Sequence, residues 1–483
     1  MRLNELFGSY RPSATDGDMD IEITGIAADS NRVEAGGLFF ALKGEKADGA
    51  DYIEDAVKNG ALAVVTEKKV NVPGTAVVYV EDSRHALSEW SSVFYGCPSD
   101  SMTITGVTGT NGKTTITNII YQMLSEEGAA GLIGTSGYFY GSKKGSFGLT
   151  TPLANDLHFI FSVMASAGVD KVAMEVSSHA LVLKRVENVK FEKAIFTNLT
   201  QDHLDFHRSL EEYYLSKLRL FGLLRKKEKG AAVINVDDVY GVRMCRDIGF
   251  QPVTYAIENK ADYMAEIIDI NMKGSTFNLI TPQGSSEVSA GLIGKFNVYN
   301  CLAAAAWAME GGRNMENICK AISRAVPVPG RCEILSKEDG SDRFVVIDYA
   351  HTPVALENIL MTLRRMVNGR LICVFGCGGD RDREKRPLMG KVAGILSDKV
   401  YLTSDNPRSE ESMSIILDIE VGIRDTATPY EVEEDREEAI RKAIKNANES
   451  DCILIAGKGD EEYQIIGEQK IFFSDRMVAK SYI

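Results

Sequence analysis

The sequence predicts an α/β protein of three domains, and two observations support this fold class. Apolar runs of strand length alternate with segments of helical periodicity along the 483 residues, which is typical of parallel sheets covered by helices. A chain of this length also exceeds the size of a single hydrophobic core. We therefore expect a central parallel sheet of the phosphate-loop type, a smaller N-terminal α/β domain and a C-terminal Rossmann-like α/β domain.

Two breaks in this alternation predict the domain boundaries. The first segment ends near YGCPSD at residues 95–100, and the second begins with the apolar strand MTITGV. The proline and glycine cluster AVPVPGR, at 325–331, is typical of a linker before the next strand. We predict domains at 1–100, 101–329 and 330–483.

The composition argues against several classes of protein. The chain has 54 Lys and Arg against 68 Asp and Glu, for a net charge of −14, whereas nucleic acids and anionic membranes attract positively charged surfaces. The N-terminus has no signal-peptide core, and the longest apolar run, CLAAAAWAM, is too short to cross a bilayer. We expect a cytoplasmic monomer that binds no nucleic acid and does not insert into a membrane. The eight cysteines are scattered singly, so we expect small core residues rather than disulfides or a zinc knuckle.

The stretch MTITGVTGTNGKTTITN, at 102–118, predicts a phosphate-binding loop. A strand runs into closely spaced glycines, and a segment with helical spacing follows. Backbone amides in such a turn bind phosphate oxygens, Lys113 supplies positive charge, and Thr114 is a ligand for magnesium. The commonest pattern has a glycine where this chain has Val107, so we expect a differently shaped loop. An ordinary glycine-rich turn is the alternative.

Polar residues follow two further strands of the middle segment. KVAME ends at Glu175, and KAIFTN is followed by a cluster that includes His203 and His207. Because ligands bind beyond the carboxyl ends of strands in open parallel sheets, these clusters should meet the phosphate loop around one site. Histidines four residues apart can share a helix face and bind zinc, but the H-E-x-x-H glutamate and an evident third ligand are missing. Magnesium, with Glu175 as an oxygen ligand, fits better.

Lys217 occupies an unusual place for a lysine. In SLEEYYLSKLRLFGLL it falls on the predicted inward face of a helix, together with Leu210, Tyr214 and Phe221. Burial of an ammonium can depress its pKa by roughly 3 to 5 units, so an inward lysine normally has a partner or a function. A lysine that extends its charged end to water from the edge of the stripe is the alternative, and spacing does not decide between them.

The third segment repeats the pattern of strands that end in polar residues. Its four strand ends lie in RFVVIDYAHTP, LICVFGCGGDRD, VYLTSDNPR and CILIAGKGDEE. Four such strands describe a binding face, which we expect to close over the nucleotide.

With these clusters around it, GTNGKTT resembles the ATP loop of the Mur ligases and their relatives the folylpolyglutamate synthetases, which use ATP to join an amino group to a carboxylate. The resemblance covers essentially the whole chain. It implies that the following residues contact ATP: Gly109, Thr110, Asn111, Gly112, Lys113, Thr114, Thr115, Asn297, Asn300, Arg331, Asp348, Tyr349 and His351.

The same resemblance implies two magnesium ions. The implied metal ligands are Thr114, Glu175, His203 and Lys217. Members of the family that add the third peptide residue have a lysine fifteen residues after the aspartate that corresponds to Asp202, and carbon dioxide converts it to an anionic carbamate. Lys113, His203 and Lys217 are thus the expected catalytic residues.

The first segment resembles the uridine-nucleotide domain of the family members that use UDP-N-acetylmuramoyl-L-alanyl-D-glutamate. The positions that match substrate contacts are Ser30, Lys46, Ala47, Thr150, Thr151, Ser177 and Arg185. Two positions depart from the family pattern. Leu183 stands where some members have a contacting glutamine, and Asp460 replaces the histidine usual after G-K-G.

The segment SDNPRSEE indicates which amine is added. Asn-Pro alone is a common turn signal, but D-N-P-R resembles the motif of members that add meso-diaminopimelate rather than lysine. Arg408 would bind the second carboxylate of that amino acid, and Glu461 would accept from its ammonium. The full set implied for this substrate is Arg381, Asp405, Asn406, Pro407, Arg408, Gly457 and Glu461.

The expected activity is therefore ATP-dependent amide formation through an acyl phosphate, in peptidoglycan precursor synthesis. Three alternatives stay open: lysine as the amine, a folate as the acceptor, and an interaction protein that binds ATP without ligating. The DNPR loop and the first segment oppose the first two. Glu175, His203 and Lys217 oppose the third, because nucleotide binding alone needs fewer metal ligands.

Overall fold

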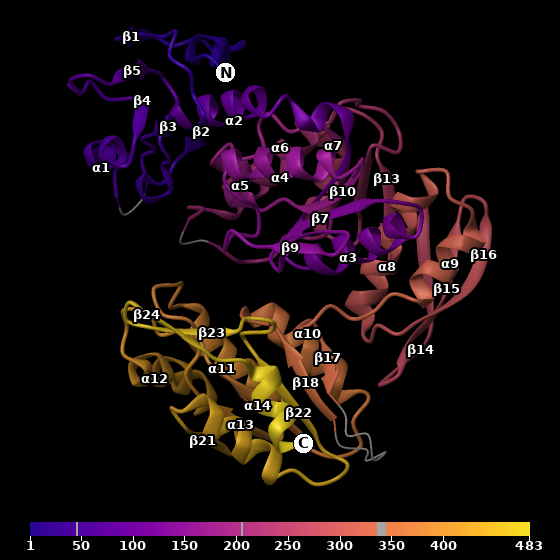
Figure 1. The fold of residues 1–483 in the computed structure, drawn as a ribbon. Coiled ribbons are helices and arrows are strands. Elements are labelled where there is room, and N and C mark those ends of the chain that lie inside the picture. The colour runs from indigo at the N-terminus through magenta and orange to yellow at the C-terminus, as the bar shows by residue number, and fades with distance from the viewer. Residues whose placement is uncertain (45–46, 204–205, 336–343) are drawn as a thin grey trace. The chain divides into compact units, whose positions relative to one another are not determined.

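The structure is a computed structural model that describes residues 1–44, 47–203, 206–335 and 344–483 (Figure 1). Among these residues the strands form sheets of five, eleven and six strands and one two-stranded hairpin. Helices alternate with strands throughout, which confirms the predicted α/β class. The chain packs as two compact units, one of residues 1–108, 123–195 and 215–232 and one of residues 109–122, 196–214 and 233–483.

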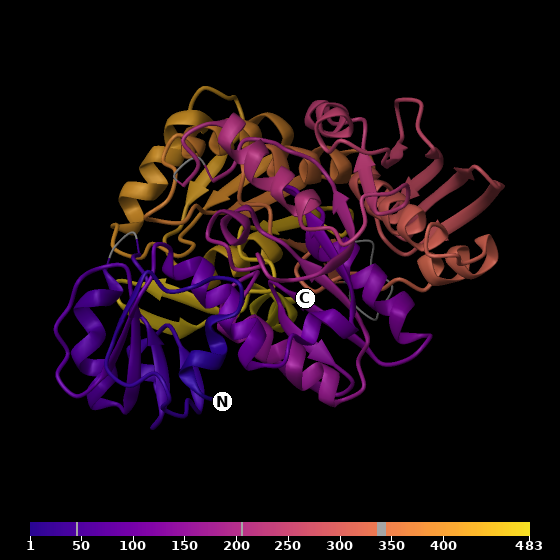
Figure 2. The same ribbon diagram turned by 90° about the horizontal axis from the view of Figure 1, so that it is seen from above.

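The N-terminal residues, indigo in Figure 2, form the five-stranded sheet in the order β1-β5-β4-β3-β2. Its strands are β1 (Ala14–Asp16), β2 (Gly25–Ala27), β3 (Gly37–Phe40), β4 (Ala61–Thr66) and β5 (Ala76–Tyr79). Its helices are α1 (Ile53–Lys58) and α2 (Ser83–Phe94), with 3-10 turns at Leu3–Phe7, Ser30–Arg32, Gly49–Tyr52 and Pro98–Ser101. β2 to β5 run parallel and β1 is antiparallel to β5. Trp90 of α2 is fully buried in the core that this sheet covers.

The eleven-stranded sheet has the order β16-β15-β14-β13-β12-β11-β6-β10-β7-β8-β9. The strands are β6 (Thr103–Thr108), β7 (Ala130–Gly134), β8 (Gly137–Tyr140), β9 (Lys143–Gly145), β10 (Lys171–Glu175), β11 (Phe191–Phe196), β12 (Ala232–Asn235), β13 (Val253–Ala256), β14 (Tyr263–Asn271), β15 (Gly274–Thr281) and β16 (Gly284–Ala290). The helices are α3 (Lys113–Ser125), α4 (Ala154–Ser166), α5 (Ser178–Val182), α6 (Leu210–Gly222), α7 (Val239–Asp247), α8 (Lys295–Met309) and α9 (Met315–Ser323). β10 pairs in parallel with β6 and β7, whereas β14 to β16 form an antiparallel meander.

The six-stranded sheet has the order β17-β18-β22-β19-β20-β21. Its strands are β17 (Glu333–Leu335), β18 (Phe344–Asp348), β19 (Leu371–Phe375), β20 (Lys399–Leu402), β21 (Tyr430–Val432) and β22 (Cys452–Ala456), and the hairpin is β23 (Tyr463–Ile466) with β24 (Gln469–Phe472). The helices are α10 (Pro353–Arg364), α11 (Lys385–Leu396), α12 (Ser412–Ile423), α13 (Arg436–Lys445) and α14 (Asp475–Tyr482). β18 to β22 pair in parallel, and only β17 is antiparallel among the described strands of this sheet.

Both faces of the six-stranded sheet are covered, as expected of a Rossmann-like fold. Alternate residues of β19 point to opposite faces, so that Cys373 packs with α10, α11 and α12 and Ile372 packs with α13 and α14. The nearly continuous apolar sequence LICVF follows from this burial on both sides. The carboxyl ends of these strands remain for polar loops.

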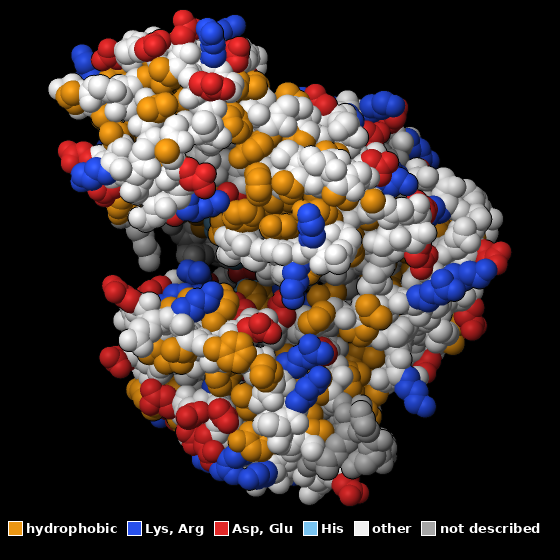
Figure 3. All heavy atoms as spheres, in the orientation of Figure 1, with side chains coloured by type: hydrophobic (Ala, Val, Ile, Leu, Met, Phe, Trp, Pro, Cys, Tyr) orange, Lys and Arg blue, Asp and Glu red, His pale blue; other side chains and the backbone are white. Residues whose placement is uncertain are grey.

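All eight cysteines are free, and Cys301, Cys332, Cys373, Cys377 and Cys452 are buried. The prediction of small core residues is confirmed for these five, whereas the other three are partly exposed. On the face shown in Figure 3, acidic and basic side chains are scattered singly or in small groups. No described helix combines the length and the apolar character that crossing a membrane requires.

Candidate active site

The predicted phosphate loop lies between β6 and α3, as the sequence indicated. Gly109 and Gly112 have φ of 151° and 90°, values that favour glycine. A Cβ at Gly109 would collide with the hydroxyl of Thr197, and one at Gly112 would lie 2.6 Å from Oδ1 of Asn300. These two glycines are therefore required both by the backbone conformation and by the close approach of neighbouring side chains.

Two amides of the loop are used within the protein. The amide of Thr110 donates to the carbonyl of Asn198 (2.9 Å). The amide of Asn111 donates to the side-chain Oδ1 of the same Asn198 (2.9 Å). Thr197 Oγ1 donates to the carbonyl of Asn111 (2.6 Å). The interpretation that the turn amides as a group bind phosphate is thus too broad. The amides of Thr110 and Asn111 hold the loop, and a phosphate would meet the amides from Gly112 onward.

Lys113 lies at the first position of α3. Its Nζ donates to the carbonyls of Gly109 (3.0 Å) and Thr110 (2.9 Å), which places the ammonium over the loop. Asn300 donates to Oδ1 of Asn297 (2.9 Å), and both side chains are buried beside the loop. The structure therefore brings together the loop and the two asparagines that the sequence analysis assigned to the same nucleotide.

Glu175 ends β10, directly beside Val107 of β6. The carboxylate is 1% exposed and accepts from the amide of Thr135 (2.9 Å) and from its hydroxyl (3.3 Å). That hydroxyl lies 3.1 Å from Oγ1 of Thr150. The predicted metal ligand and one predicted substrate residue thus share a neighbour.

Three further predicted substrate residues surround the same strand end. Thr151 Oγ1 donates to the carbonyl of Glu175 (2.9 Å) and accepts from the amide of Ser177 (3.1 Å). Arg185 donates to the carbonyl of Thr151 (2.9 Å), and burial, together with nearby Arg84, lowers the pKa of Arg185 to about 10. A pair of guanidiniums at a half-buried position favours an anionic ligand there.

The N-terminal substrate positions are separate in sequence from this group. Ser30 is buried, and its carbonyl accepts from Nδ2 of Asn59 (2.9 Å). Ala47 is exposed, and Lys46 lies outside the described residues. Leu183 lines a small cavity together with Arg185, so the wall at that position is apolar.

The two histidines after β11 do not share a helix face. His203 has φ of 55°, which is left-handed backbone, and its neighbours Leu204 and Asp205 lie outside the described residues. His207 is 2% exposed, with its ring 4.9 Å from that of Tyr213. The zinc alternative therefore loses its geometric basis.

Asp202 stands beside His203. Burial opposes ionisation of the Asp202 carboxyl, but the neighbouring imidazole of His203 and nearby positive groups lower the pKa of Asp202 below its usual value. Within the described residues no group of three or more His, Cys, Asp and Glu side chains could hold a metal ion. Magnesium retains several waters and needs few protein ligands, so a single buried carboxylate such as Glu175 fits it.

Lys217 is fully buried on α6, between Tyr214 and Phe221, which are also buried. The prediction that it lies on the inward face is confirmed. A lysine that extends its ammonium to water is excluded, because no part of the side chain is exposed.

Two of the residues expected around the adenosine line a cavity of about 280 Å³. Asn297 and Arg331 form part of its wall, and the guanidinium of Arg331 lies 4.0 Å from the centre of the Tyr349 ring. Asp348 accepts from the amides of Cys332 (2.7 Å) and Ala350 (2.8 Å), and burial raises the pKa of its carboxyl. Asp348 therefore fixes the backbone of this region.

His351 follows in the same loop. Its Nδ1 lies 2.9 Å from the carbonyl of Tyr349, and its own carbonyl accepts from Lys385 Nζ (2.9 Å). Burial and the positive charge of Lys385 lower the pKa of His351, so the ring is neutral near pH 7.

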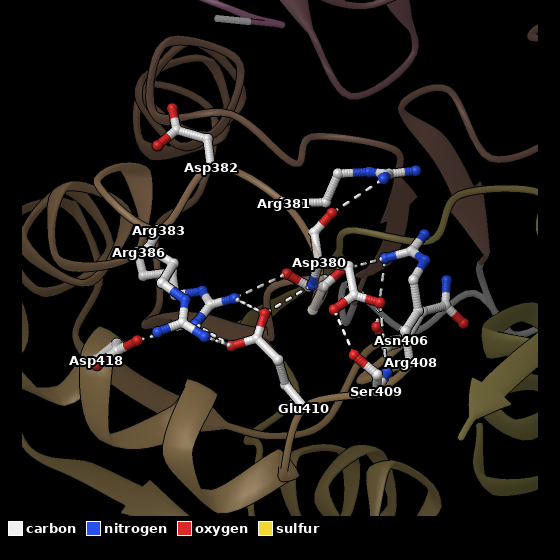
Figure 4. A network of polar contacts seen from close by, with 12 residues as sticks. Asp380, Arg381, Asp382, Arg383, Arg386, Asn406, Arg408, Ser409, Glu410 and Asp418 are labelled. Atoms are coloured by element: carbon white, nitrogen blue, oxygen red, sulfur yellow. Dashed lines mark hydrogen bonds and ion pairs between the residues drawn. The ribbon is translucent and has the colours of Figure 1, made fainter. Parts of the chain in front are cut away.

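The predicted diaminopimelate residues come together from three loops, which follow β19, β20 and β22. Asn406 Nδ2 donates to Oε2 of Glu461 (2.9 Å). A Cβ at Gly457, whose φ is 115°, would lie 2.7 Å from Oδ2 of Asp405. Arg408 donates from Nη1 to the carbonyl of Gly379 (2.7 Å), in the loop that also carries Arg381 (Figure 4). Among the described residues nothing accepts from Nε or Nη2 of Arg408, which leaves one edge of the guanidinium for a ligand.

Lys458 belongs to this cluster, although the sequence analysis did not single it out. It is fully buried, and its Nζ donates to Oδ1 of Asn406 (3.2 Å) and Oε2 of Glu461 (3.3 Å). Burial raises the pKa of Glu461, and Lys458 opposes this rise. A lysine two residues after the buried strand CILIA was the available signal.

Family comparisons agree with this arrangement. Residues 107–308 match the Mur ligase middle domain, residues 330–459 the Mur ligase glutamate ligase domain, and residues 22–95 the Mur ligase family catalytic domain. Two curated relatives carry the name UDP-N-acetylmuramoyl-L-alanyl-D-glutamate–2,6-diaminopimelate ligase. The one from Caldanaerobacter subterraneus subsp. tengcongensis is 45% identical, and that from Clostridium acetobutylicum, numbered 1, is 42% identical. Each match covers 100% of this chain and 99% of the relative.

Solved structures show the same fold. A structure of a UDP-N-acetylmuramoyl-L-alanyl-D-glutamate–2,6-diaminopimelate ligase is 34% identical, with a TM-score of 0.68, and the match covers 100% of this chain and 98% of that one. A MurF structure from Acinetobacter baumannii, 20% identical, has a TM-score of 0.68 and covers 94% of this chain and 95% of its own. The predicted three-domain α/β fold is confirmed, and the chain belongs to the Mur ligase family.

Proposed function

We propose that this protein joins meso-diaminopimelate to the D-glutamate of UDP-N-acetylmuramoyl-L-alanyl-D-glutamate, with ATP, in peptidoglycan precursor synthesis. The observation that carries the choice of amine is that Glu461, from the loop after β22, lies beside Asn406 and Arg408 of the loop after β20. The guanidinium of Arg408 suits the carboxylate of an amino acid centre, and the nearby carboxylate of Glu461 suits its ammonium. The full-length relatives named for this reaction support the same choice.

The nucleotide would be bound by the phosphate loop. ADP is present in a MurF structure from Thermotoga maritima that is 19% identical to this chain. Lys113 and the amides from Gly112 onward would orient the γ-phosphate, and Asn297, Asn300 and Arg331 would surround the adenosine. Lys113 supplies positive charge where negative charge develops during transfer.

The reaction would proceed in two steps. An oxygen of the D-glutamate γ-carboxylate forms a bond to the γ-phosphorus while the bond from that phosphorus to the β,γ-bridging oxygen breaks, which gives an acyl phosphate and ADP. The diaminopimelate nitrogen then bonds to the acyl carbon, the bond from that carbon to the phosphate oxygen breaks, and the nitrogen loses a proton. Lys113 would stabilise the negative charge of the tetrahedral intermediate.

Magnesium would supply charge neutralisation at the transferring phosphate. Thr114, Glu175 and His203 are the residues that would hold it, together with Lys217 as a carbamate. The carbamate would form when carbon dioxide adds to the nitrogen of Lys217, which is fully buried. Replacement of Lys217 by alanine should reduce phosphate release at least about 100-fold, and a small carboxylate in the buffer should restore part of it. A mass increase that matches the carbamate in the intact protein gives a second readout. Near-normal activity of the alanine variant without added carboxylate would exclude this role.

The muramoyl dipeptide would contact Thr150, Thr151, Ser177 and Arg185, which lie around the end of β10. Ser30, Lys46 and Ala47 would contact the uridine nucleotide. We keep the predicted domains of 1–100 for this nucleotide, 101–329 for ATP and ligation, and 330–483 for the amine. A cytoplasmic monomer remains the prediction for location and assembly.

The experiment that tests the function measures phosphate release with ATP, magnesium and UDP-N-acetylmuramoyl-L-alanyl-D-glutamate. The amine is meso-diaminopimelate, lysine or absent. We expect release that depends on diaminopimelate, with a tripeptide product identified by mass. Preference for lysine would keep the ligase but overturn the role of Arg408. No release with any amine would favour an ATP-binding protein that does not ligate.

A further inference from the structure

Two neighbouring loops carry the arginines of the proposed amine site. One comprises residues 378–384, between β19 and α11, and the other comprises residues 404–410, after β20; we call them the amine-site loops. The amide of Gly379 donates to the carbonyl of Asn406 (2.9 Å), and a Cβ at Gly379 would collide with the carbonyl of Pro407. The loops are therefore in direct backbone contact.

Arg386 is a fully buried guanidinium behind these loops, at the start of α11. It binds Glu410 with two hydrogen bonds, of 3.0 and 2.8 Å, and also donates to Oδ2 of Asp418 on α12 (2.9 Å). A fourth hydrogen bond reaches the carbonyl of Gly378 (3.4 Å). Arg386 thus holds one loop through Glu410 and the other through Gly378.

Glu410 passes this restraint on. Its Oε1 accepts from the amide of Asp380 (2.6 Å), and the carboxylate of Asp380 accepts from the hydroxyl of Ser409 (2.6 Å) and, at 3.4 Å, from its amide. Figure 4 shows the chain of contacts from Arg386 through Glu410 to Asp380 and Ser409, with Arg408 next in sequence. Arg386 makes no contact with Arg408 itself among these bonds.

The restraint acts on strained backbone. Asp380 and Arg408 have φ of 52° and 53°, which is left-handed conformation for residues other than glycine. Such conformations are unfavourable for these residues and persist only where their surroundings fix them. The carboxylate of Glu410 accepts from the amide of Asp380, and the carboxylate of Asp380 accepts from Ser409, which precedes Arg408.

We propose that Arg386 is a positioning residue for amine recognition, which fixes the amine-site loops through Glu410 so that Arg408 and Arg381 are held for the distal carboxylate of the amine. The inference rests on the proposed function and adds to it a residue that does not touch the substrate. Glu410 is 12% exposed and Arg386 is not exposed at all, so the pair lies behind the binding face rather than on it.

The experiment compares the wild type with Arg386→Met, Arg386→Lys and Glu410→Gln. We measure KM for diaminopimelate, KM for ATP and the ratio of kcat/KM for diaminopimelate to that for lysine. The expected result for Arg386→Met is a KM for diaminopimelate raised at least about tenfold, a KM for ATP changed less than about twofold and a ratio that falls at least about tenfold. Arg386→Lys, which keeps the charge but not the paired geometry, should recover part of the loss.

A matched control is Arg370→Met. Arg370 binds Asp451 through Nε (3.0 Å) and Nη2 (2.7 Å). These two residues precede β19 and β22, so they lie at the amino ends of the strands, away from the amine-site loops. The Arg370→Met variant should have a lower melting temperature than the wild type, with KM for diaminopimelate and KM for ATP unchanged. The double variant of Arg386 and Glu410 should raise KM for diaminopimelate by less than the product of the single effects, because both act through one contact.

Three results distinguish the possible failures. No use of diaminopimelate by the wild type overturns the proposed function. If the wild type uses diaminopimelate, but Arg386→Met and Arg370→Met have the same KM for diaminopimelate and the same KM for ATP, the positioning role is overturned. If Arg386→Met does not fold, Arg386→Lys and Glu410→Gln decide by the same two KM values, and unchanged values in both overturn the role.

Discussion

The phosphate loop and the amine-site loops both follow parallel strands, and both hold backbone in conformations that most residues avoid. The phosphate loop does so with glycine and with the uncharged partners Asn198 and Thr197, and its own Lys113 supplies its charged hydrogen bonds. The amine-site loops do so with residues other than glycine and with buried charge, since Glu410 joins Arg386 to the amide of Asp380. The first design fits a ligand that brings its own charge. The second has internal charge pairs, so we expect it to depend on pH and on distant residues.

The largest effect should come from the phosphate loop. Replacement of Lys113 by alanine should reduce phosphate release about 10³-fold, because the ammonium held over the loop is its only cationic side chain among residues 109–115. Lys113→Arg should retain binding of ATP but lose most of the rate. Release within tenfold of the wild type in the alanine variant would contradict a role of this charge in phosphoryl transfer.

Arg408→Ala should have a selective effect. We expect kcat/KM for diaminopimelate to fall about 10²-fold, while kcat/KM for lysine changes much less, because lysine lacks the carboxylate that the guanidinium would bind. Side-by-side kinetics with both amines check this. Equal losses for the two amines would show that Arg408 shapes the loop rather than recognises the substrate.

The charge of Glu410 should appear in the acid stability of the protein. Arg386 lowers the pKa of Glu410 to about 2, below its usual value near 4.5. The unfolded chain therefore binds a proton at a higher pH than the folded one, so this stabilisation is complete above about pH 4.5 and is lost as pH falls towards 2.

Glu410→Gln should cost about 1–3 kcal/mol of unfolding free energy at pH 7, and its deficit should shrink as pH falls from 4.5 towards 2. Denaturant unfolding at several pH values measures both quantities. A deficit that stays constant with pH would remove the contrast between the charged and the neutral design. Asn198→Asp is unsuitable as a control because it adds a charge, so Thr197→Val serves as the neutral comparison in the phosphate loop.

The smallest effect concerns a residue outside both regions. His158 on α4 is fully buried, and its two ring nitrogens have no hydrogen-bond partner among the described residues, so burial lowers its pKa to about 3. The unfolded chain takes up this proton near pH 6.5, and stability should therefore fall as pH decreases from 6.5 towards 3. His158→Leu should change stability at pH 7 by about 1 kcal/mol or less and reduce the slope in that interval. An unchanged slope would place the pH dependence elsewhere.

The sequence predicted the fold from local patterns. β19 is apolar throughout and β10 is apolar between Lys171 and Glu175, because these strands are buried, and polar residues at or after their last positions mark the carboxyl ends. The phosphate loop was also predictable from local sequence, because the backbone conformation of this short turn requires glycine at Gly109 and Gly112. Burial of Lys217 followed from helical spacing.

Other features had no local signal. Arg386 meets Glu410 and Asp418, which are distant in sequence, and a charged run such as DRDREKR reads as a solvated loop until the fold brings its partners. The use of the Thr110 and Asn111 amides by Asn198 was equally hidden, because it depends on the neighbouring strand β11. The alternative in which His203 and His207 share a helix face was wrong, because His203 itself has left-handed backbone.

The contact of Asn300 with Gly112 has a consequence for synthesis of the protein on the ribosome. The loop motif is translated early, but Asn198 and Asn300, which hold and border it, emerge much later. At about 5–20 residues per second, extension from Gly112 to Asn300 takes on the order of ten to forty seconds. For the first part of that interval the nascent chain lacks both residues, and until its end it lacks Asn300. If the loop binds ATP as proposed, we expect ATP to stabilise the protein only in the late stages of folding, after α8 has been synthesised.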